Sequence, residues 1–279
     1  MRVAAVNDLS GFGKCSLVAD LSVMSAMGIE VCPVPTAVLS AQTGFSHYHI
    51  HDIEDMVANC RNDYISMGAE FDGILTGYIP NVKVADDVLS FVSSFSHNGA
   101  VLLVDPVMAD GGRCYSNYSK EMHEKIAKLS SMADIITPNL TELCLLAGYD
   151  AEFAKSGINK KEAINEIIAI ADKAKAHDGQ SIVVTGISVG ENSICNLVVS
   201  PGEMEVIECS FNGQSYSGTG DLLAASLLGG VLKGKRIVDA VKLATEFISS
   251  AIAETSEKDR NYGIDFEKSL YKLKGGKKV

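Results

Sequence analysis

Short apolar segments and longer helix-like segments alternate along almost the whole chain. Apolar runs of strand length end at turn residues at positions 2–7, 72–78, 100–104 and 181–186, and patterns typical of helices lie between them. Two neighbouring parallel strands need a long crossover, and a helix usually provides it. The alternation therefore predicts an α/β fold, a three-layer αβα sandwich in which helices cover both faces of a mostly parallel central sheet.

One part of the chain breaks the alternation. Two apolar runs near 193–210 follow one another around Pro201 and Gly202, which predicts an antiparallel hairpin on the sheet. Because the sequence contains no internal repeat, low-complexity run or linker, we expect residues 1–279 to form a single domain. The basic segment at about 272–279 is expected to be a short, frayed tail.

Residue patterns also set the expected bounds of the other elements. Pro33 and Pro35 divide residues 29–39 into two short strand-like pieces, at an edge or a bend of the sheet. The remaining prediction is a strand at 133–137 and helices at 16–27, 52–66, 82–95, 139–147, 160–176 and from Gly220 and Ile237 onward.

The charge balance limits the partners of the protein. There are 24 Lys and Arg against 35 Asp and Glu, a net charge of −11, which argues against nucleic acid and against a membrane surface. The seven cysteines show no CxxC spacing and suit reduced thiols. No apolar run reaches the roughly 20 residues that span a bilayer, and no signal peptide precedes the first strand. We therefore expect a soluble, cytoplasmic protein.

The turn after the first strand places polar side chains where ligands bind in open α/β sheets. Gly13-Lys14 resembles part of a P-loop, but Asp8 and Cys15 stand where that motif needs Gly and Ser or Thr. Asp8 and Ser10 are then expected to emerge at the carboxyl end of the strand. A plain connecting loop is the alternative.

A glycine-rich turn runs into an apolar helix at Gly218-Thr219-Gly220-Asp221. Backbone N–H groups at a helix N-terminus converge on one spot, where the helix dipole also favours an anion. Asp221 beside this anion site could accept a proton from an attacking hydroxyl. An anion site with a neighbouring carboxylate is typical of phosphoryl transfer to an alcohol. The alternative is an ordinary first turn of a buried helix, in which the dipole alone favours Asp221.

Three further strands end in polar residues. Asp105 and Asp110 follow the strand at 100–104, Thr137 to Glu142 follows the next, and Thr185-Gly186 follows another. Acidic groups gathered at one sheet edge repel one another, so they indicate a hard cation such as Mg²⁺. Two structural alternatives stay open: Asn139 and Glu142 suit a helix N-terminus, and Asp110 with the next two glycines suits a simple turn.

Two groups of reactive side chains have weaker functional interpretations. His47, His49 and His51 alternate, so on a strand they would share a face and could bind zinc, although a solvated loop fits equally. Cys114 lies beside the Asp110 turn, where a thiol could react with an aldehyde or be inert.

In order and spacing, these segments resemble the ribokinase-like superfamily, and within it the pyridoxal/pyridoxine/pyridoxamine kinases of vitamin B6. The resemblance covers essentially the whole chain. The matching segments are the N-terminal strand with its Gly turn, Thr43-Gly44, Gly77-Tyr78, Asp105-Pro-Val-Met-Ala-Asp110, Thr137-Pro-Asn-Leu-Thr-Glu142 and Gly218-Thr-Gly-Asp221.

The resemblance implies ATP and Mg²⁺ as cofactors, and a role for each matching residue. Asp221 would take the proton of the substrate's 5′-hydroxymethyl group, while backbone N–H groups of Gly218, Thr219 and Gly220 stabilise the moving γ-phosphoryl group. The other implied positions are Asp105, Thr137, Asn139, Thr185, Gly186 and Thr219 along ATP, Asp8, Thr43, Tyr78 and Tyr115 around the pyridine ring, and Asp110 and Glu142 at Mg²⁺. A monovalent cation (K⁺ or Na⁺) and a homodimer are further implications.

Two departures keep other substrates open. Pyridoxal kinases commonly carry Ser, in a Ser-His pair, where this chain has Asp8, and Asp could pair with a ring nitrogen or a charged aminomethyl group. Gly186 after Thr185 also occurs in hydroxymethylpyrimidine kinases of thiamine synthesis, which are the alternative enzyme class. A non-catalytic sensor of nucleotide or vitamer is a third reading, although it predicts loss of the base or of the anion site.

Overall fold

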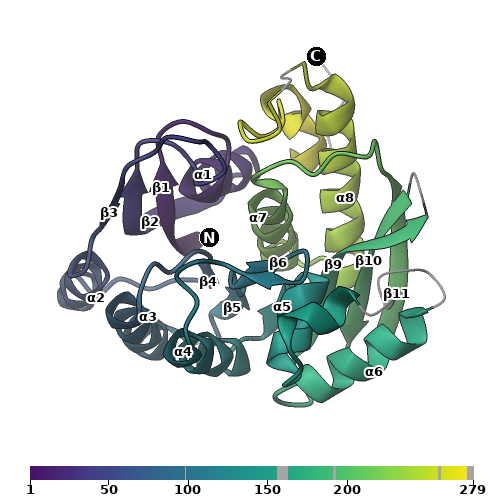
Figure 1. The fold of residues 1–279 in the computed structure, drawn as a ribbon. Helices are drawn as coiled ribbons and strands as arrows, with labels where there is room; N and C mark the ends of the chain where they lie inside the picture. Colours follow the sequence, from purple (N-terminus) through teal and green to yellow (C-terminus); the bar gives the residue numbers. More distant parts are fainter. Residues whose placement is uncertain (98, 156–162, 191–192, 257–258, 275–279) are drawn as a thin grey trace.

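The described part of the chain is built around a nine-stranded sheet (Figure 1). The structure is a computed structural model and describes residues 1–97, 99–155, 163–190, 193–256 and 259–274. In spatial order the strands are β11 (Glu203–Ser210), β10 (Ser193–Ser200), β9 (Ser181–Gly190), β8 (Ile135–Ile136), β5 (Val101–Val104), β4 (Gly73–Thr76), β1 (Arg2–Ser10), β2 (Glu30–Leu39) and β3 (Ile50–Asp52).

The strands from β9 to β2 all run parallel, as the alternation predicts. At the two ends of the sheet, β3 pairs antiparallel with β2, and β10 and β11 form the expected antiparallel hairpin beside β9. A separate two-stranded ribbon, β6 (Ala109–Asp110) with β7 (Arg113–Cys114), lies near the carboxyl edge of the sheet (Figure 1).

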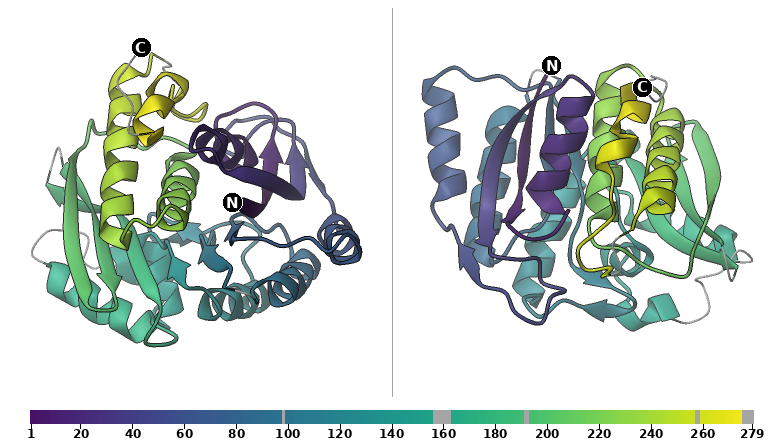
Figure 2. Two further views of the ribbon diagram at one scale, coloured as in Figure 1. Left: turned by 180° about the vertical axis from the view of Figure 1, so that it is seen from behind. Right: turned by 90° about the horizontal axis from the view of Figure 1, so that it is seen from above.

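Helices cover both faces of the sheet, so the predicted three-layer α/β sandwich is confirmed (Figure 2). Alternate strand residues face opposite layers: Ile74 packs in the core of one face, and Leu75 in the core of the other. One layer holds α2 (Met56–Ser66), α3 (Val82–Phe95), α4 (Lys120–Ser131), α5 (Leu140–Leu146) and α6 (Ile164–Ala174), and the other holds α1 (Ser16–Ala26), α7 (Thr219–Leu232) and α8 (Ile237–Glu254).

Several predicted bounds were wrong. The first strand continues to Ser10, because its pairing with β2 resumes after a bulge beyond Asn7. Residues 30–39 form one strand instead of two pieces. Pro33 and Pro35 lie in the part of β2 that pairs with β1 on one side, while β3 pairs only with residues 37–39 on the other side. The N–H groups that the prolines lack are therefore not needed by β3. The helix predicted from residue 52 begins at Met56, since Ile50–Asp52 pairs with β2.

The C-terminal end also differs from the prediction. Residues 272–274 are not frayed, because they belong to the short helix η3 (Glu267–Lys274), in which Leu273 is buried against α8 and its neighbours. The rest of the predicted tail, 275–279, and the predicted start of the helix at 160 lie outside the described residues. The sequence prediction missed α4, η1 (Ala151–Lys155), η3 and the β6–β7 ribbon.

No helix in the described ranges combines the length and the apolar character that crossing a membrane requires.

Candidate active site

The carboxyl ends of four central strands lie level with one another. Val6 pairs with Thr76, Thr76 with Val104, and Val104 with Ile136. The next residue of each strand therefore emerges at the same edge, where the N-termini of α1 and α7 also arrive. The polar residues predicted at the strand ends meet at this edge.

The side chain of Asn7 links several residues of this edge by hydrogen bonds. The sequence prediction missed this residue. Its side-chain nitrogen donates to Asp20 Oδ2 at 3.1 Å and to Asp221 Oδ1 at 3.2 Å. Its side-chain oxygen accepts the N–H groups of Asp8, at 3.0 Å, and Tyr78, at 2.8 Å. The only signal in the sequence is a polar residue directly after the apolar run Val3-Ala4-Ala5-Val6.

Asp221 is half-buried in the first turn of α7, and each of its oxygens has a donor. Oδ1 accepts from Asn7, and Oδ2 accepts the N–H of Ser16, the first residue of α1, at 2.8 Å. Burial, helped by the charge of Asp8, raises the pKa of Asp221 to about 6, against the Ser16 N–H and the Asn7 amide, which lower it. Asp221 is therefore poised to ionise near neutral pH.

Asp8 lies beside this carboxylate, and Tyr78 lies beside Asp8. Asp8 is 4% exposed, and Ser10 Oγ donates to it at 2.9 Å. Burial raises the pKa of Asp8, against the hydrogen bonds from Ser16 and Ser10. Burial also raises the pKa of Tyr78 to about 12, with contributions from the charges of Asp52 and Asp8. The structure thus brings together two of the residues predicted around an aromatic ring.

Thr43 is exposed in the loop between β2 and β3. Next to it, the buried Gln42 accepts the N–H of Gly44 at 2.8 Å and donates to the carbonyl of Asn261 at 2.6 Å. This loop therefore rests on the turn at 259–263 near the C-terminus.

The glycine-rich turn packs directly on the turn before α1. Gly218 has a left-handed φ of +83°, and a Cβ there would overlap the carbonyl oxygen of Lys14. The helix begins at Thr219, one residue earlier than predicted, and Thr219 Oγ1 donates to the carbonyl of Tyr216 at 3.0 Å. A Cβ on Gly220 would lie 3.7 Å from Asp105 Oδ2. The helix N-terminus therefore faces Asp105.

Asp105 directly follows β5 and accepts a hydrogen bond from Thr137 Oγ1 at 3.1 Å. Burial, and then the charge of Asp221, raise its pKa to about 7, against the hydrogen bond from Thr137, which lowers it. Two strand-end predictions, Asp105 and Thr137, thus form one hydrogen-bonded pair across adjacent strands.

Asn139 and Glu142 form a capping box at the start of α5, so the structural interpretation of this motif is confirmed. Glu142 is 4% exposed; Oε2 accepts the Asn139 N–H at 2.9 Å, and Oε1 accepts the Met108 N–H at 3.0 Å. Asn139 Nδ2 donates to the carbonyl of Ala109 at 2.8 Å. Asn139 and Glu142 therefore fix the segment between β5 and β6, in addition to capping α5.

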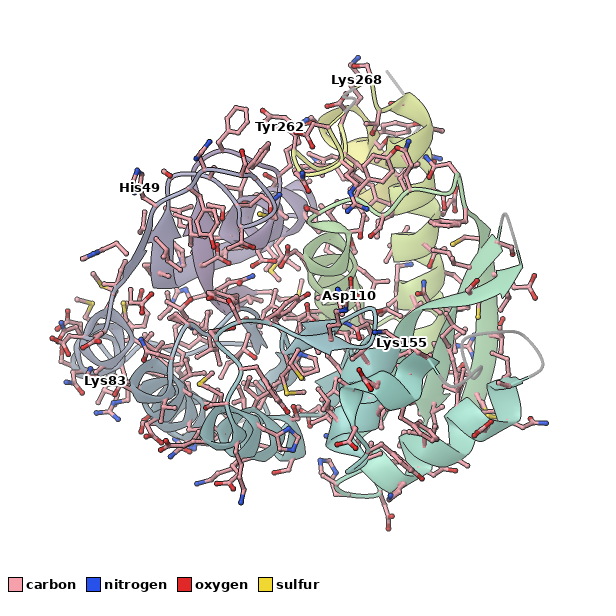
Figure 3. The ribbon with its side chains drawn as sticks, in the orientation of Figure 1. His49, Lys83, Asp110, Lys155, Tyr262 and Lys268 are labelled. Carbon is pink, nitrogen blue, oxygen red and sulfur yellow. The ribbon has the colours of Figure 1, made fainter. Side chains whose placement is uncertain are left out.

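Asp110 ends β6 and is exposed, and its Oδ1 accepts the Gly111 N–H at 2.7 Å. Lys155 of η1 packs its side chain against Gly112, and Figure 3 shows the labelled Asp110 and Lys155 in the same region. Within the described ranges, no three His, Cys, Asp or Glu side chains are grouped to hold a metal ion.

The phenol of Tyr115 stands among the acidic side chains. Burial first, and then the charges of four carboxylates, raise the pKa of this phenol: Glu142, Asp110, Asp105 and Asp221. The predicted metal, nucleotide and catalytic carboxylates therefore all act electrostatically on one tyrosine side chain, which is itself 43% exposed.

Thr185 and Gly186 lie one strand further along the edge. The Thr185 N–H donates to the carbonyl of Pro138 at 2.9 Å, and Thr185 forms an isolated parallel β-bridge with Asn139. Gly186 is exposed, and its N–H donates to Asn196 Oδ1 at 3.2 Å.

The three histidines do not share a strand. His47, His49 and His51 are all exposed, and of the three only His51 belongs to β3. Cys114 is exposed on β7, and partial burial raises the pKa of its thiol. Neither group joins the carboxylate cluster at the sheet edge.

Comparison with known proteins identifies the family. A model described as phosphomethylpyrimidine kinase matches residues 12–264. The chain belongs to the phosphomethylpyrimidine kinase family. A crystal structure of a Bacteroides thetaiotaomicron protein, solved with pyridoxal, is 31% identical and covers 98% of this chain and 95% of that one, with a TM-score of 0.87.

The relatives of this chain fall into two branches, pyridoxine kinases and hydroxymethylpyrimidine/phosphomethylpyrimidine kinases. The pyridoxine kinase of Bacillus subtilis is 25% identical over 249 residues, 87% of each chain. The hydroxymethylpyrimidine/phosphomethylpyrimidine kinase of Haemophilus influenzae is 26% identical over 259 residues, 90% of each chain. The expected ribokinase-like, pyridoxal kinase-type protein is confirmed, and the chain is a small-molecule kinase that uses ATP. The two branches are equally similar to it.

The contact between the glycine-rich turn and Lys14 generates a stability prediction. Gly213 and Gly218 both have left-handed φ angles, +78° and +83°, but only Gly218 faces a backbone atom. Gly213→Ala should cost roughly 1 kcal/mol of unfolding free energy for the backbone conformation alone. Gly218→Ala should cost about 1–3 kcal/mol more, because the turns must separate. Urea unfolding of the two variants measures the difference, and equal losses would contradict the packing argument.

Proposed function

We propose that the protein transfers the γ-phosphoryl group of ATP to the 5′-hydroxymethyl group of a vitamin B6 vitamer: pyridoxamine, pyridoxine or pyridoxal. The observation that carries the proposal is the Asp221 carboxylate, held by two N–H donors at the N-terminus of α7 near the buried Asp8, with the half-buried Tyr78 beside Asp8. The likeness to a Bacteroides protein solved with pyridoxal supports a B6 vitamer.

Asp221 acts as the general base in this proposal. One of its oxygens takes the proton of the substrate hydroxyl as that oxygen attacks the γ-phosphorus, and the bond to the leaving ADP breaks. The N–H groups of Gly218, Thr219 and Gly220 stabilise the charge of the moving group, together with the positive end of the α7 dipole. The base stays oriented because Asn7 and Ser16, whose N–H groups hold Asp221, are both buried.

The residues at the edge fit a Mg²⁺ ion that arrives with ATP. Mg²⁺ typically needs only one or two protein carboxylates when phosphate oxygens and water complete its shell. Asp110 is exposed and could bind directly, whereas both oxygens of Glu142 already accept backbone N–H groups, which favours contact through water. The ion would neutralise the phosphates during transfer.

The remaining assignments complete the proposed complex. Around the pyridine ring we place Asp8, Thr43, Tyr78 and Tyr115, and along ATP we place Asp105, Thr137, Asn139, Thr185, Gly186 and Thr219. A monovalent cation near the anion site rests on the family resemblance, whereas a single domain and a cytoplasmic location rest on the patterns of the sequence. A homodimer is supported by the exposed apolar side chains Leu9, Val38 and Ile50 on the β1–β3 edge.

Hydroxymethylpyrimidine (phosphate) kinase is the second candidate, supported by the family model and by the Haemophilus relative. Its substrate is also a hydroxymethyl group on a nitrogen heterocycle, so the same base and anion site would serve it. A non-catalytic sensor has little support, because Asp221 and the glycine-rich turn are both present.

An ATP-coupled phosphorylation assay separates these candidates. With pyridoxal, pyridoxine, pyridoxamine and hydroxymethylpyrimidine as acceptors, we expect a B6 vitamer to give the highest kcat/KM. A higher value for hydroxymethylpyrimidine would favour thiamine synthesis, and no turnover with any acceptor would favour the sensor.

Asp221→Asn should lower kcat by about 10²–10⁴-fold while ATP binding persists, because only the base is lost. In the parent protein kcat should fall as the pH drops through about 6, since the base must be ionised and the pKa of Asp221 is raised to that value. A matched control is Asp239→Asn: Asp239 also lies in the first turn of a helix, α8, but pairs with Arg236 far from the edge. Near-normal turnover of Asp221→Asn would refute the assignment.

Asp8 in place of Ser is expected to favour pyridoxamine or pyridoxine over pyridoxal, because a carboxylate can pair with a charged aminomethyl group or a ring N–H. Asp8→Ser should lower the kcat/KM ratio of pyridoxamine to pyridoxal about tenfold, the effect of one charged hydrogen bond. Ser10→Ala, which removes a hydroxyl from Asp8 but leaves its charge, serves as the control. An unchanged ranking of the three vitamers in Asp8→Ser would disprove the hypothesis.

A further inference from the structure

Beside the proposed base lies a buried chain of three side chains, Asp20, Asn7 and Asp221, joined by hydrogen bonds. We propose that Asn7 and Asp20 are positioning residues for Asp221: Asp20 orients the Asn7 amide, and the amide holds the carboxylate of the base in its working orientation. The inference rests on the proposed role of Asp221 and extends it to two residues that no motif marks.

Asn7 can adopt only one orientation. All four of its hydrogen-bonding positions are used, because its nitrogen faces two carboxylates and its oxygen faces two backbone N–H groups. A flipped amide would turn its oxygen toward the carboxylates and its NH₂ toward the N–H donors. Asn7 is also 2% exposed, and a Cβ on Gly77 would lie 2.5 Å from its amide atoms, so the side chain has no room to turn.

Asp20 is the second anchor of that amide. It lies on α1 and is 0% exposed; Oδ2 accepts from Asn7, while Oδ1 has no hydrogen-bond partner. A buried carboxylate with an unpaired oxygen is costly as an anion and much less so as a neutral acid. Burial, and then the charge of Asp221, raise the pKa of Asp20 well above its usual range. Asp20 therefore anchors Asn7 as an uncharged group.

The surroundings of Asp221 strengthen the need for such an anchor. The titratable groups that face it from the neighbouring elements are all acidic: Asp8, Asp20, Asp105, Cys15 and Tyr115. Across the described residues, no Lys, Arg or His forms an ion pair with Asp8, Asp20, Asp105 or Asp221. The Asn7 amide and the Ser16 N–H are then the two donors that fix the base, one on each oxygen.

The test compares Asn7→Ala and Asp20→Ala with Asp20→Asn, which restores a neutral group of the same shape. Both alanine variants should lower kcat roughly 10- to 100-fold, the scale of a misplaced catalytic group, with the KM for ATP within about twofold of the parent. Asp20→Asn should recover most of the turnover that Asp20→Ala loses. Gln180→Ala is the matched control, since it removes a fully buried, hydrogen-bonded amide at the opposite edge of the sheet.

A second measurement does not depend on turnover. Carboxyl ¹³C NMR, with the Asp221 signal assigned from Asp221→Asn, follows the ionisation of this side chain. The donated hydrogen bond of Asn7 lowers the pKa of Asp221, so Asn7→Ala should move the titration to higher pH, and Gln180→Ala should not. An unmoved titration in folded Asn7→Ala would overturn the inference, as would Asp20→Asn and Asp20→Ala with equal losses. If the parent phosphorylates no acceptor but the titration moves, the proposed function fails and the positioning role stands.

Discussion

Val6, Thr76, Val104 and Ile136 pair side by side across four parallel strands, and this register decides what the carboxyl edge contains. The residues that follow them are Asn7, Gly77, Asp105 and Thr137. A slip of one residue in any strand would turn its last side chain to the other face of the sheet. The buried apolar residues on both faces of the sheet prevent that slip. The two hydrophobic cores therefore fix the positions of the polar side chains at the carboxyl edge.

The same edge gathers carboxylates without a matching set of cations. Backbone N–H groups at helix N-termini partly take the place of lysine and arginine: α1 donates to Asp221 through Ser16, and the first turn of α7 lies close to Asp105 at Gly220. Because Gly218 rests on the Lys14 carbonyl, the two helix starts are coupled although they are two hundred residues apart in the chain. Such an edge is suited to a ligand that brings its own metal ion.

The sequence predicts the layers well because hydrophobic alternation is a local property. The α3 helix has the predicted bounds, 82–95, since its apolar spacing and the Asn81 cap are both local. Tertiary pairing decides what the sequence could not show: β3 exists only against β2, and Glu142 of the expected helix cap also accepts the N–H of Met108, 34 residues away. Asn7 escaped prediction because its role depends on Asp221, 214 residues away.

The buried carboxyls also shape how the fold responds to acid. An unfolded chain releases the protons of Asp side chains near pH 4, whereas burial keeps them longer in the native state, to about 6 at Asp221 and about 7 at Asp105. Between these values the native state binds more protons than the unfolded state, so the free energy of unfolding falls as the pH rises. These two carboxyls therefore stabilise the ligand-free fold more in mild acid, where the base is protonated, than at neutral pH. At neutral pH the ionised base therefore lowers the free energy of unfolding of the protein.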